Sequence, residues 1–215
     1  MIISPGRKFI FVHIPKTGGT SLALALEDRA MKDDILIGDT PKAKKRKGRL
    51  KTLTPAGRLW KHSTLGDIDG VVDPAAYFVL TIVRNPWDRA VSYYHWLQTQ
   101  SFAHPAVTRA QTLSFSQFIN HEATQVGFRA HPYGSYVVDA AGTSRCDLFA
   151  RLETLEQDLI PFWEHIGFAC KVDRVNASAR ARDWRPYYSD ADVAVIADSC
   201  ATDIAQFGYR FDCSS

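Results

Sequence analysis

Residues 11–21, FVHIPKTGGTS, join an apolar run to a Gly-Gly turn that carries one lysine and three hydroxyl side chains. The apolar run, KFIFVHI at 8–14, is typical of a central parallel strand covered on both faces. An Ala- and Leu-rich segment follows and predicts a helix that begins near Gly19. A strand, a glycine turn and a helix in this order predict a phosphate site, because amides at the helix start and the helix dipole favour an anion.

Each residue type in this turn suits a phosphate group. Glycines let an anion come close to the backbone, a lysine adds a mobile positive charge, and hydroxyl side chains add donors. The residues predicted to bind the phosphate are Lys16, Thr17, Gly18, Gly19, Thr20 and Ser21. The alternative is a turn that only joins strand to helix, with Lys16 in solvent.

The order of these residues differs from that of a Walker A loop, which reads G-x-x-x-x-G-K-[ST]. Here Lys16 precedes the glycines, and G-K-[ST] occurs nowhere in the chain. This order disfavours an NTPase or a small-molecule kinase, although a nucleotide or sugar kinase with a variant loop is kept as the alternative enzyme. No acidic pair accompanies the loop, so no metal is implied.

A second strand and helix repeat the pattern. The run AYFVLTIV at 76–83 predicts a buried strand, and it leads directly into a helix with Asn85 as N-cap and Pro86 at its first position. Arg84 stands at the carboxyl end of this strand, where an open α/β sheet exposes its ligand crevice. Ser92 lies two turns into the helix, away from the apolar stripe of Trp87, Val91 and Tyr94.

Arg84 and Ser92 together predict a second oxyanion clamp, formed by a guanidinium fork and a hydroxyl. Each residue also has a structural alternative. Arg84 could form a salt bridge at the helix start, and Ser92 could belong to an ordinary polar helix surface.

The whole chain, residues 1–215, predicts one α/β domain with a central parallel sheet, flanking helices and a P-loop-like strand–turn–helix. Within it we expect a basic loop at about 42–51 and a mostly helical insertion at about 99–136. Further expected elements are a strand within 146–155, a helix over 154–167, and a last helix from Ser189 to about Gln206.

The formal net charge of +3 comes from one local run, because residues 42–51, KAKKRKGRLK, hold seven basic and no acidic residues. We expect a solvated loop here that guides an anionic acceptor by its charge. A nucleic-acid-binding module is the alternative. It is disfavoured because the run lacks interleaved aromatic residues.

The cysteines and the N-terminus indicate a reducing, cytoplasmic setting. Cys146, Cys170, Cys200 and Cys213 are irregularly spaced, which favours reduced thiols over zinc or a disulfide framework. The start of the chain lacks the layout of a signal peptide, and its apolar run is too short to span a bilayer.

The two motifs HIPKTGGTS (13–21) and RNPWDRAVSYY (84–94) resemble the binding motifs of sulfotransferases that use 3′-phosphoadenylyl sulfate (PAPS). The most similar type is the carbohydrate sulfotransferases, including Golgi heparan-sulfate uronosyl enzymes and their bacterial relatives. Weaker similarity continues through 151–159 and 187–211. The resemblance implies the sulfotransferase fold, PAPS as sulfuryl donor without a required metal, and a hydroxyl acceptor on a saccharide, acidic ones included. From the features of the basic run and of the short apolar run given above, we expect no nucleic-acid partner and no membrane span.

Roles for particular residues follow from the same resemblance. The loop from Lys16 to Ser21 would hold the 5′-phosphosulfate, with Lys16 serving the leaving group, and Arg84 with Ser92 would hold the 3′-phosphate. In the family a histidine between the two motifs is the general base, which implies His62 here. The other candidates for the base are His13 in the first strand, His104 and His131 before prolines, and Glu27, expected on an exposed helix surface.

Overall fold

The computed structural model describes residues 1–173 and 183–212. The described chain separates into two compact units. The first unit contains residues 1–83 and 133–173, and the second contains 84–132 and 183–212. A single domain over the whole chain stays a prediction, and Cys213 lies outside the described residues.

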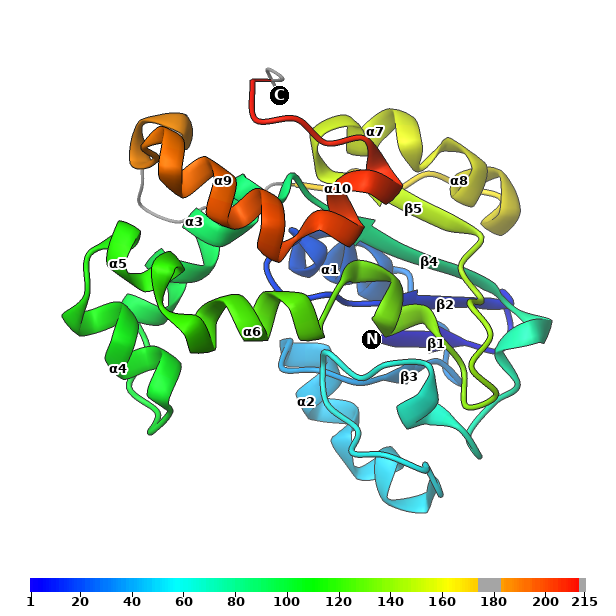
Figure 1. Cartoon of the computed structure of the whole chain (residues 1–215). Coiled ribbons are helices and arrows are strands. Elements are labelled where there is room, and N and C mark those ends of the chain that lie inside the picture. Colours follow the sequence, from blue (N-terminus) through cyan, green and yellow to red (C-terminus); the bar gives the residue numbers. More distant parts are fainter. Residues whose placement is uncertain (174–182, 213–215) are drawn as a thin grey trace. The chain divides into compact units, whose positions relative to one another are not determined.

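The first unit is built on a five-stranded sheet with the order β3-β1-β2-β4-β5 (Figure 1). Three strands are parallel neighbours, namely β2 (Phe9–Val12), β4 (Phe78–Val83) and β5 (Leu148–Arg151). The other two, β1 (Ile2–Ser4) and β3 (Ile35–Leu36), pair antiparallel. The predicted parallel centre is therefore present, but the complete sheet is mixed.

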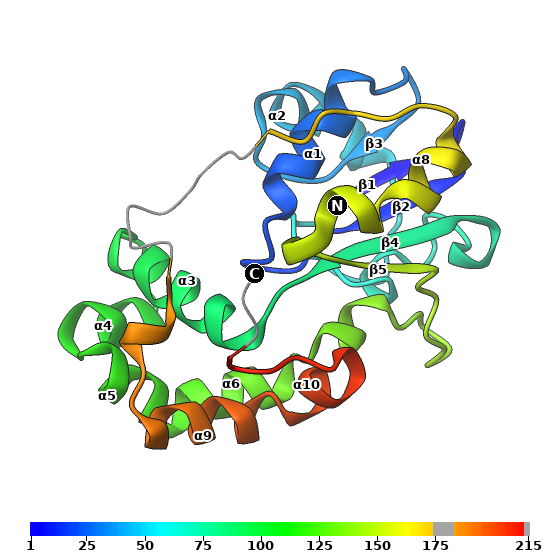
Figure 2. The same ribbon diagram turned by 90° about the horizontal axis from the view of Figure 1, so that it is seen from above.

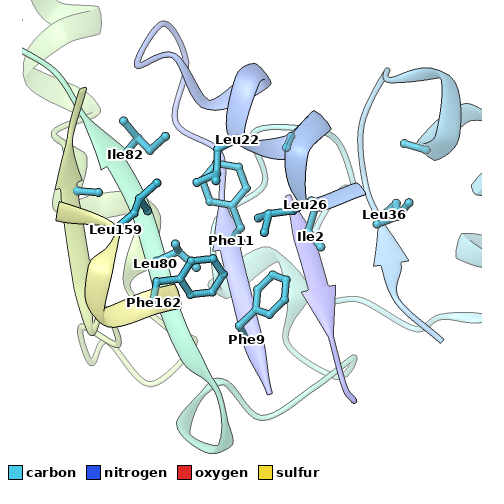
Figure 3. Close-up of a cluster of buried hydrophobic side chains, with 13 residues drawn as sticks. Ile2, Phe9, Phe11, Leu22, Leu26, Leu36, Leu80, Ile82, Leu159 and Phe162 are labelled. Atoms are coloured by element: carbon cyan, nitrogen blue, oxygen red, sulfur yellow. The ribbon is translucent and has the colours of Figure 1, made fainter. Parts of the chain in front are cut away.

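Helices α1 (Gly19–Asp28), α7 (Leu155–Asp158) and α8 (Ile160–Ile166) bring apolar side chains to the core of this sheet. Phe9 and Phe11 of β2 point to the same face, since alternate strand residues share a face. They meet Leu22 and Leu26 of α1, and Phe162 of α8 (Figure 3). The helix expected over 154–167 is divided at Leu159 because Pro161, in the first turn of α8, cannot donate a backbone hydrogen bond.

The basic run is helical, so the prediction of a loop at 42–51 is wrong. It forms α2 (Pro41–Arg46) and the 3₁₀ helix η1 (Lys47–Thr52). The Thr40 hydroxyl caps α2 by accepting from the amide of Ala43 at 3.1 Å. Ala43 itself is buried in the core cluster of the sheet. Arg46 and Arg49 also fix the segment, because they donate to the carbonyls of Met31 and Lys32.

The remaining short elements of the first unit are 3₁₀ turns. They are η2 (Gly66–Ile68), η3 (Pro74–Ala76), η4 (Tyr133–Val137) and η5 (Leu152–Thr154).

The second unit consists of helices. These are α3 (Pro86–Gln98), α4 (Pro105–Thr112), α5 (Phe115–Asn120), α6 (Glu122–Ala130), η6 (Arg185–Tyr187), α9 (Asp190–Ser199) and α10 (Ala201–Phe207). The segment 99–136 is thus rich in helix, as expected. Helices α6 and α9 contact each other (Figure 2). The expected last helix is divided at Cys200, whose φ of −118° and ψ of 23° are not helical.

Contacts at its N-terminus and along its apolar stripe hold helix α3 in place. The Asn85 side chain accepts from the amide of Trp87 at 3.1 Å, as predicted for an N-cap. Trp87 and Tyr94 are buried; the Trp87 indole donates to the carbonyl of Val193 at 3.1 Å. The Tyr94 ring packs 5.3 Å from that of Phe118. These contacts fix the helix that carries the second motif.

Candidate functional site

The first motif forms the connection from β2 to α1 in the first unit. Gly18 has a φ of 86° and serves as the N-cap residue of α1, and Lys16 has a φ of 67°. A left-handed conformation is ordinary for glycine but costs a residue with a side chain about 1–3 kcal/mol, and such strain often occurs at binding sites. The loop is therefore held in a shape that a plain connection does not require.

Thr17 holds this loop from within. Its side chain is fully buried, and its hydroxyl donates to the carbonyl of Ile14 at 3.0 Å. The predicted contact of this hydroxyl with an anion stays a prediction. Lys16, Thr20 and Ser21 are half-exposed, so their side chains are accessible from solvent.

Gly19 is required by close packing. A Cβ atom at this position would lie 2.5 Å from Cδ2 and 2.9 Å from Nε2 of His13, and 3.1 Å from Cζ of Phe11. Both rings are buried and stack at a centroid distance of 5.9 Å, so neither can move easily. The second glycine of the motif thus lets the start of α1 rest directly on the ring of His13.

Replacing Gly19 with alanine should lower the free energy of unfolding by about 1–3 kcal/mol, because the methyl group overpacks a buried contact. Urea unfolding measures this change. Gly127→Ala is the matched control, since a Cβ there meets nothing within 4 Å and alanine favours a helix. Equal stability of Gly19→Ala and wild type would contradict the packing argument.

His62 lies against the first motif, although 49 residues separate it from His13. Its Nδ1 is 2.7 Å from the carbonyl oxygen of His13, and the two rings are 4.9 Å apart at 72°. A carbonyl can only accept, so Nδ1 must be the donor. In the neutral ring Nε2 then carries the free lone pair, so Nε2 is the atom that can accept a proton.

Burial keeps both histidines neutral. Removal from water lowers the pKa of His62 from 6.5 to about 4, and it lowers the pKa of His13 well below its usual range. The unfolded chain would bind a proton at His62 near pH 6.5, whereas the folded protein resists protonation down to about pH 4. Stability therefore falls as pH drops through this window.

The other candidates for a base have structural roles. Glu27 is buried, not exposed as expected, because the last turn of α1 faces the start of α2. There its carboxylate accepts from the Thr40 hydroxyl at 2.7 Å, and burial raises its pKa. The Nδ1 of His104 caps α4 by accepting from the amide of Ala106 at 3.1 Å. His131 contacts the carbonyl of Gly127 at 3.0 Å.

Trp60 received no role from the sequence, yet it lies beside the candidate base. Its ring centroid is 5.0 Å from that of His62, and the ring planes are nearly perpendicular at 87°. An aromatic residue two positions before the candidate histidine was the available signal.

The second motif begins the second unit. Arg84 is buried and pairs with Asp88, with Nε at 2.8 Å and Nη2 at 2.6 Å from Oδ2. The structural alternative for Arg84, a salt bridge at the helix start, is thus present. Ser92 is buried and does not lie on an exposed polar surface. Asp88 and Ser92 are four residues apart and therefore share one face of α3.

The remaining predictions concern metals, membranes and thiols. In residues 1–173 and 183–212, no group of three or more His, Cys, Asp or Glu side chains could hold a metal ion. No helix of that part of the chain is long and apolar enough to cross a membrane. A cytoplasmic location stays a prediction. Cys146, Cys170 and Cys200 are free thiols, and burial raises the pKa of Cys146 and of Cys200 to about 12.

Comparisons with known proteins bear on both motifs. The model of a family described as "Sulfotransferase family" matches residues 1–189. Among solved structures, the mouse sulfotransferase SULT7A1 complexed with PAP is similar, with a TM-score of 0.55 and 16% sequence identity over 96% of this chain and 88% of that one. A search of curated proteins found no match.

At 16% identity the solved structure is evidence for the fold alone, and it confirms the predicted fold class. The family match is broader evidence, because it spans the strands of the sheet, the first motif, His62 and the second motif. The chain therefore belongs to the sulfotransferase family.

Proposed function

We propose that this protein is a PAPS-dependent sulfotransferase that acts on a hydroxyl group of a carbohydrate. The observation that supports this most is the contact of His62 with the phosphate-type loop: a neutral imidazole is fixed by the carbonyl of His13, inside the first motif. A base fixed beside an anion-binding loop suits the transfer of a charged group to a hydroxyl.

The residues of the first motif fit the phosphosulfate end of such a donor. The loop is held in left-handed turns at Lys16 and Gly18, it precedes the start of α1, and residues 13–21 contain no acidic side chain. When bound, PAPS supplies a sulfuryl group attached to a phosphate leaving group. Lys16 would place a positive charge where negative charge grows on that phosphate, and Thr20 and Ser21 would donate hydroxyl hydrogen bonds.

The second motif would hold the other end of the donor. Arg84 offers a guanidinium fork and Ser92 a hydroxyl on the face of α3 that also carries Asp88. This assignment rests on the likeness of RNPWDRAVSYY to the family's motif. The 3′-phosphate of PAPS distinguishes it from AMP or ATP, so this clamp would provide the selectivity for the donor.

The chain's own residues would activate the acceptor. Nε2 of His62 would accept the proton of the attacking hydroxyl, since Nδ1 is engaged as a donor.

Helix α2 and η1 add a concentration of positive charge in the same unit, and Lys42, Lys45, Arg46 and Arg49 line a cavity of about 460 Å³. This charge would attract an acidic saccharide.

Thermal unfolding with nucleotides tests the proposal. PAP, the 3′-phosphoadenosine 5′-phosphate left after sulfuryl transfer, should raise the Tm by about 5–10 °C at a hundred times its Kd. AMP should do much less, because it lacks the phosphate assigned to Arg84 and Ser92. Equal shifts with PAP and AMP would contradict a 3′-phosphate site, and a shift with ATP and magnesium but none with PAP would favour the alternative of a kinase.

A further inference from the structure

Trp60 is exposed where a tryptophan is expected to be covered. All five tryptophans lie in the described residues; Trp87 and Trp184 are 4% and 3% exposed, whereas Trp60 is 46% exposed. Leaving an indole in water forgoes the favourable burial of a large apolar surface. Tryptophan is enriched at surfaces that bind other molecules, because a single ring supplies a large contact area and a polar N–H.

The segment that presents this ring is fixed by hydrogen bonds. The amide of Trp60 donates to Oγ of Ser63 at 2.9 Å, and the amide of Ser63 donates back to the carbonyl of Trp60 at 3.0 Å. The Ser63 side chain is fully buried, and its hydroxyl also lies 3.0 Å from the carbonyl of Arg58. A ring held on such a turn loses little freedom when a ligand stacks on it.

The same turn places Trp60 next to the candidate base. The centroid of its ring is 5.0 Å from that of His62, whose Nδ1 is fixed by His13. A cyclic molecule stacked on the exposed indole would therefore lie beside the ring of His62. This is the location that an acceptor hydroxyl must reach.

The charge around the turn favours one kind of cyclic molecule. Lys61 lies between Trp60 and His62 in the sequence and pairs with Asp39 at 2.7 Å. Asp39 directly precedes Thr40, which is the N-cap residue of the basic helix α2. The electron-rich face of an indole attracts the C–H bonds on the flat side of a pyranose, while the ring hydroxyls remain at the rim. The adjacent basic segment would attract a carboxylate on such a ring.

We propose that Trp60 is the acceptor platform: a pyranose ring of an acidic saccharide stacks on its indole and presents a hydroxyl to His62. This inference rests on the proposed sulfotransferase function, and it adds the residue that selects the acceptor.

The test uses the full-length protein saturated with PAP and two probes. One probe is a tetrasaccharide of alternating glucuronate and N-acetylglucosamine, and the other is 4-nitrophenol. Binding is followed by calorimetry for the wild type, Trp60→Ala and Trp60→Phe, and PAP binding is measured separately for each. Phe102→Ala is the matched control, since Phe102 is an exposed ring (48%) of the second unit that contacts Trp96 and His104.

We expect Trp60→Ala to weaken tetrasaccharide binding about tenfold, the usual effect of losing one aromatic stacking contact. Trp60→Phe should restore most of this binding, and PAP affinity should not change in any variant. Phe102→Ala should bind the tetrasaccharide like the wild type.

Other outcomes would overturn the inference. These are unchanged tetrasaccharide binding in Trp60→Ala, an equal loss in Phe102→Ala, or binding of 4-nitrophenol alone, which would point to a phenolic acceptor. A wild type that binds PAP but not the tetrasaccharide would also overturn it, while leaving the sulfotransferase proposal intact. Failure to bind PAP at all would instead contradict the proposed function.

Discussion

His62→Ala is expected to lower the turnover number by about 10²–10⁴-fold, the usual contribution of a general base, while PAP binding stays nearly normal. The reason is geometric. Nδ1 of His62 donates to the carbonyl of His13 at 2.7 Å, so Nε2 is the basic atom that the substitution removes. Steady-state kinetics with saturating PAPS and calorimetric titration of PAP measure the two quantities separately.

His62→Asn sharpens this test. The asparagine amide can still donate to the carbonyl of His13, as Nδ1 does, but it has no basic atom in the place of Nε2. Both variants should therefore be slow, and His62→Asn should be the more stable of the two. If His62 had only a structural role, His62→Asn would recover most of the wild-type rate.

The dependence on pH provides a further check on the same residue. Only the neutral imidazole accepts a proton, so wild-type kcat/KM should fall as pH drops toward the pKa of about 4, and this limb should disappear in both variants. Because stability also falls in acid, circular dichroism must show folded protein at every pH used. A retained acid limb in folded His62→Asn would assign that limb to another group.

Lys16→Ala should lower turnover by about 10²–10³-fold, as expected when one electrostatic contact to a developing negative charge is removed. Alanine keeps a Cβ atom at the left-handed φ of 67°, so the strain in the loop is unchanged. The effect should appear mainly in kcat, because the contact with the leaving oxygen is strongest in the transition state.

Arg84→Ala is the contrasting variant for this prediction. It should reduce PAP affinity about 10- to 100-fold, the cost of a lost charge-assisted contact, with a smaller effect on kcat. The change removes the ion pair between Arg84 and Asp88 at 2.6 Å, so Arg84→Ala/Asp88→Asn should be measured alongside it. Indistinguishable effects of Lys16→Ala and Arg84→Ala on affinity and on rate would contradict the division of roles between the two motifs.

The alternating strands and helices that carry the two motifs could be predicted from the sequence because their signals are local. The four residues of β2 are all buried, as its uninterrupted apolar run indicated. The capping side chain of Asn85 and the ring of Pro86 determine where α3 begins. Signals of this kind depend on neighbours within a few residues, so they are visible before any tertiary contact is known.

The sequence did not reveal features that depend on distant partners. The strands β1 and β3 have only three and two residues and exist through antiparallel pairing with β2 and with each other. Helix α2 is held by distant partners, since Ala43 is buried in the core of the sheet and Arg46 donates to the carbonyl of Met31. Glu27 is covered through its contact with Thr40, which lies 13 residues further along the chain. Helical periodicity carries no information at that separation.

For the candidate site, the sequence alone predicted two anion-binding motifs, because residue types and their order are properties of short segments. The resemblance to a family selected His62, but only the tertiary structure brought its Nδ1 to His13 and set Trp60 beside it. Burial in that packing also lowers the pKa of His62 to about 4. The physical reason is that contact across 49 residues and exclusion of water are products of the folded chain.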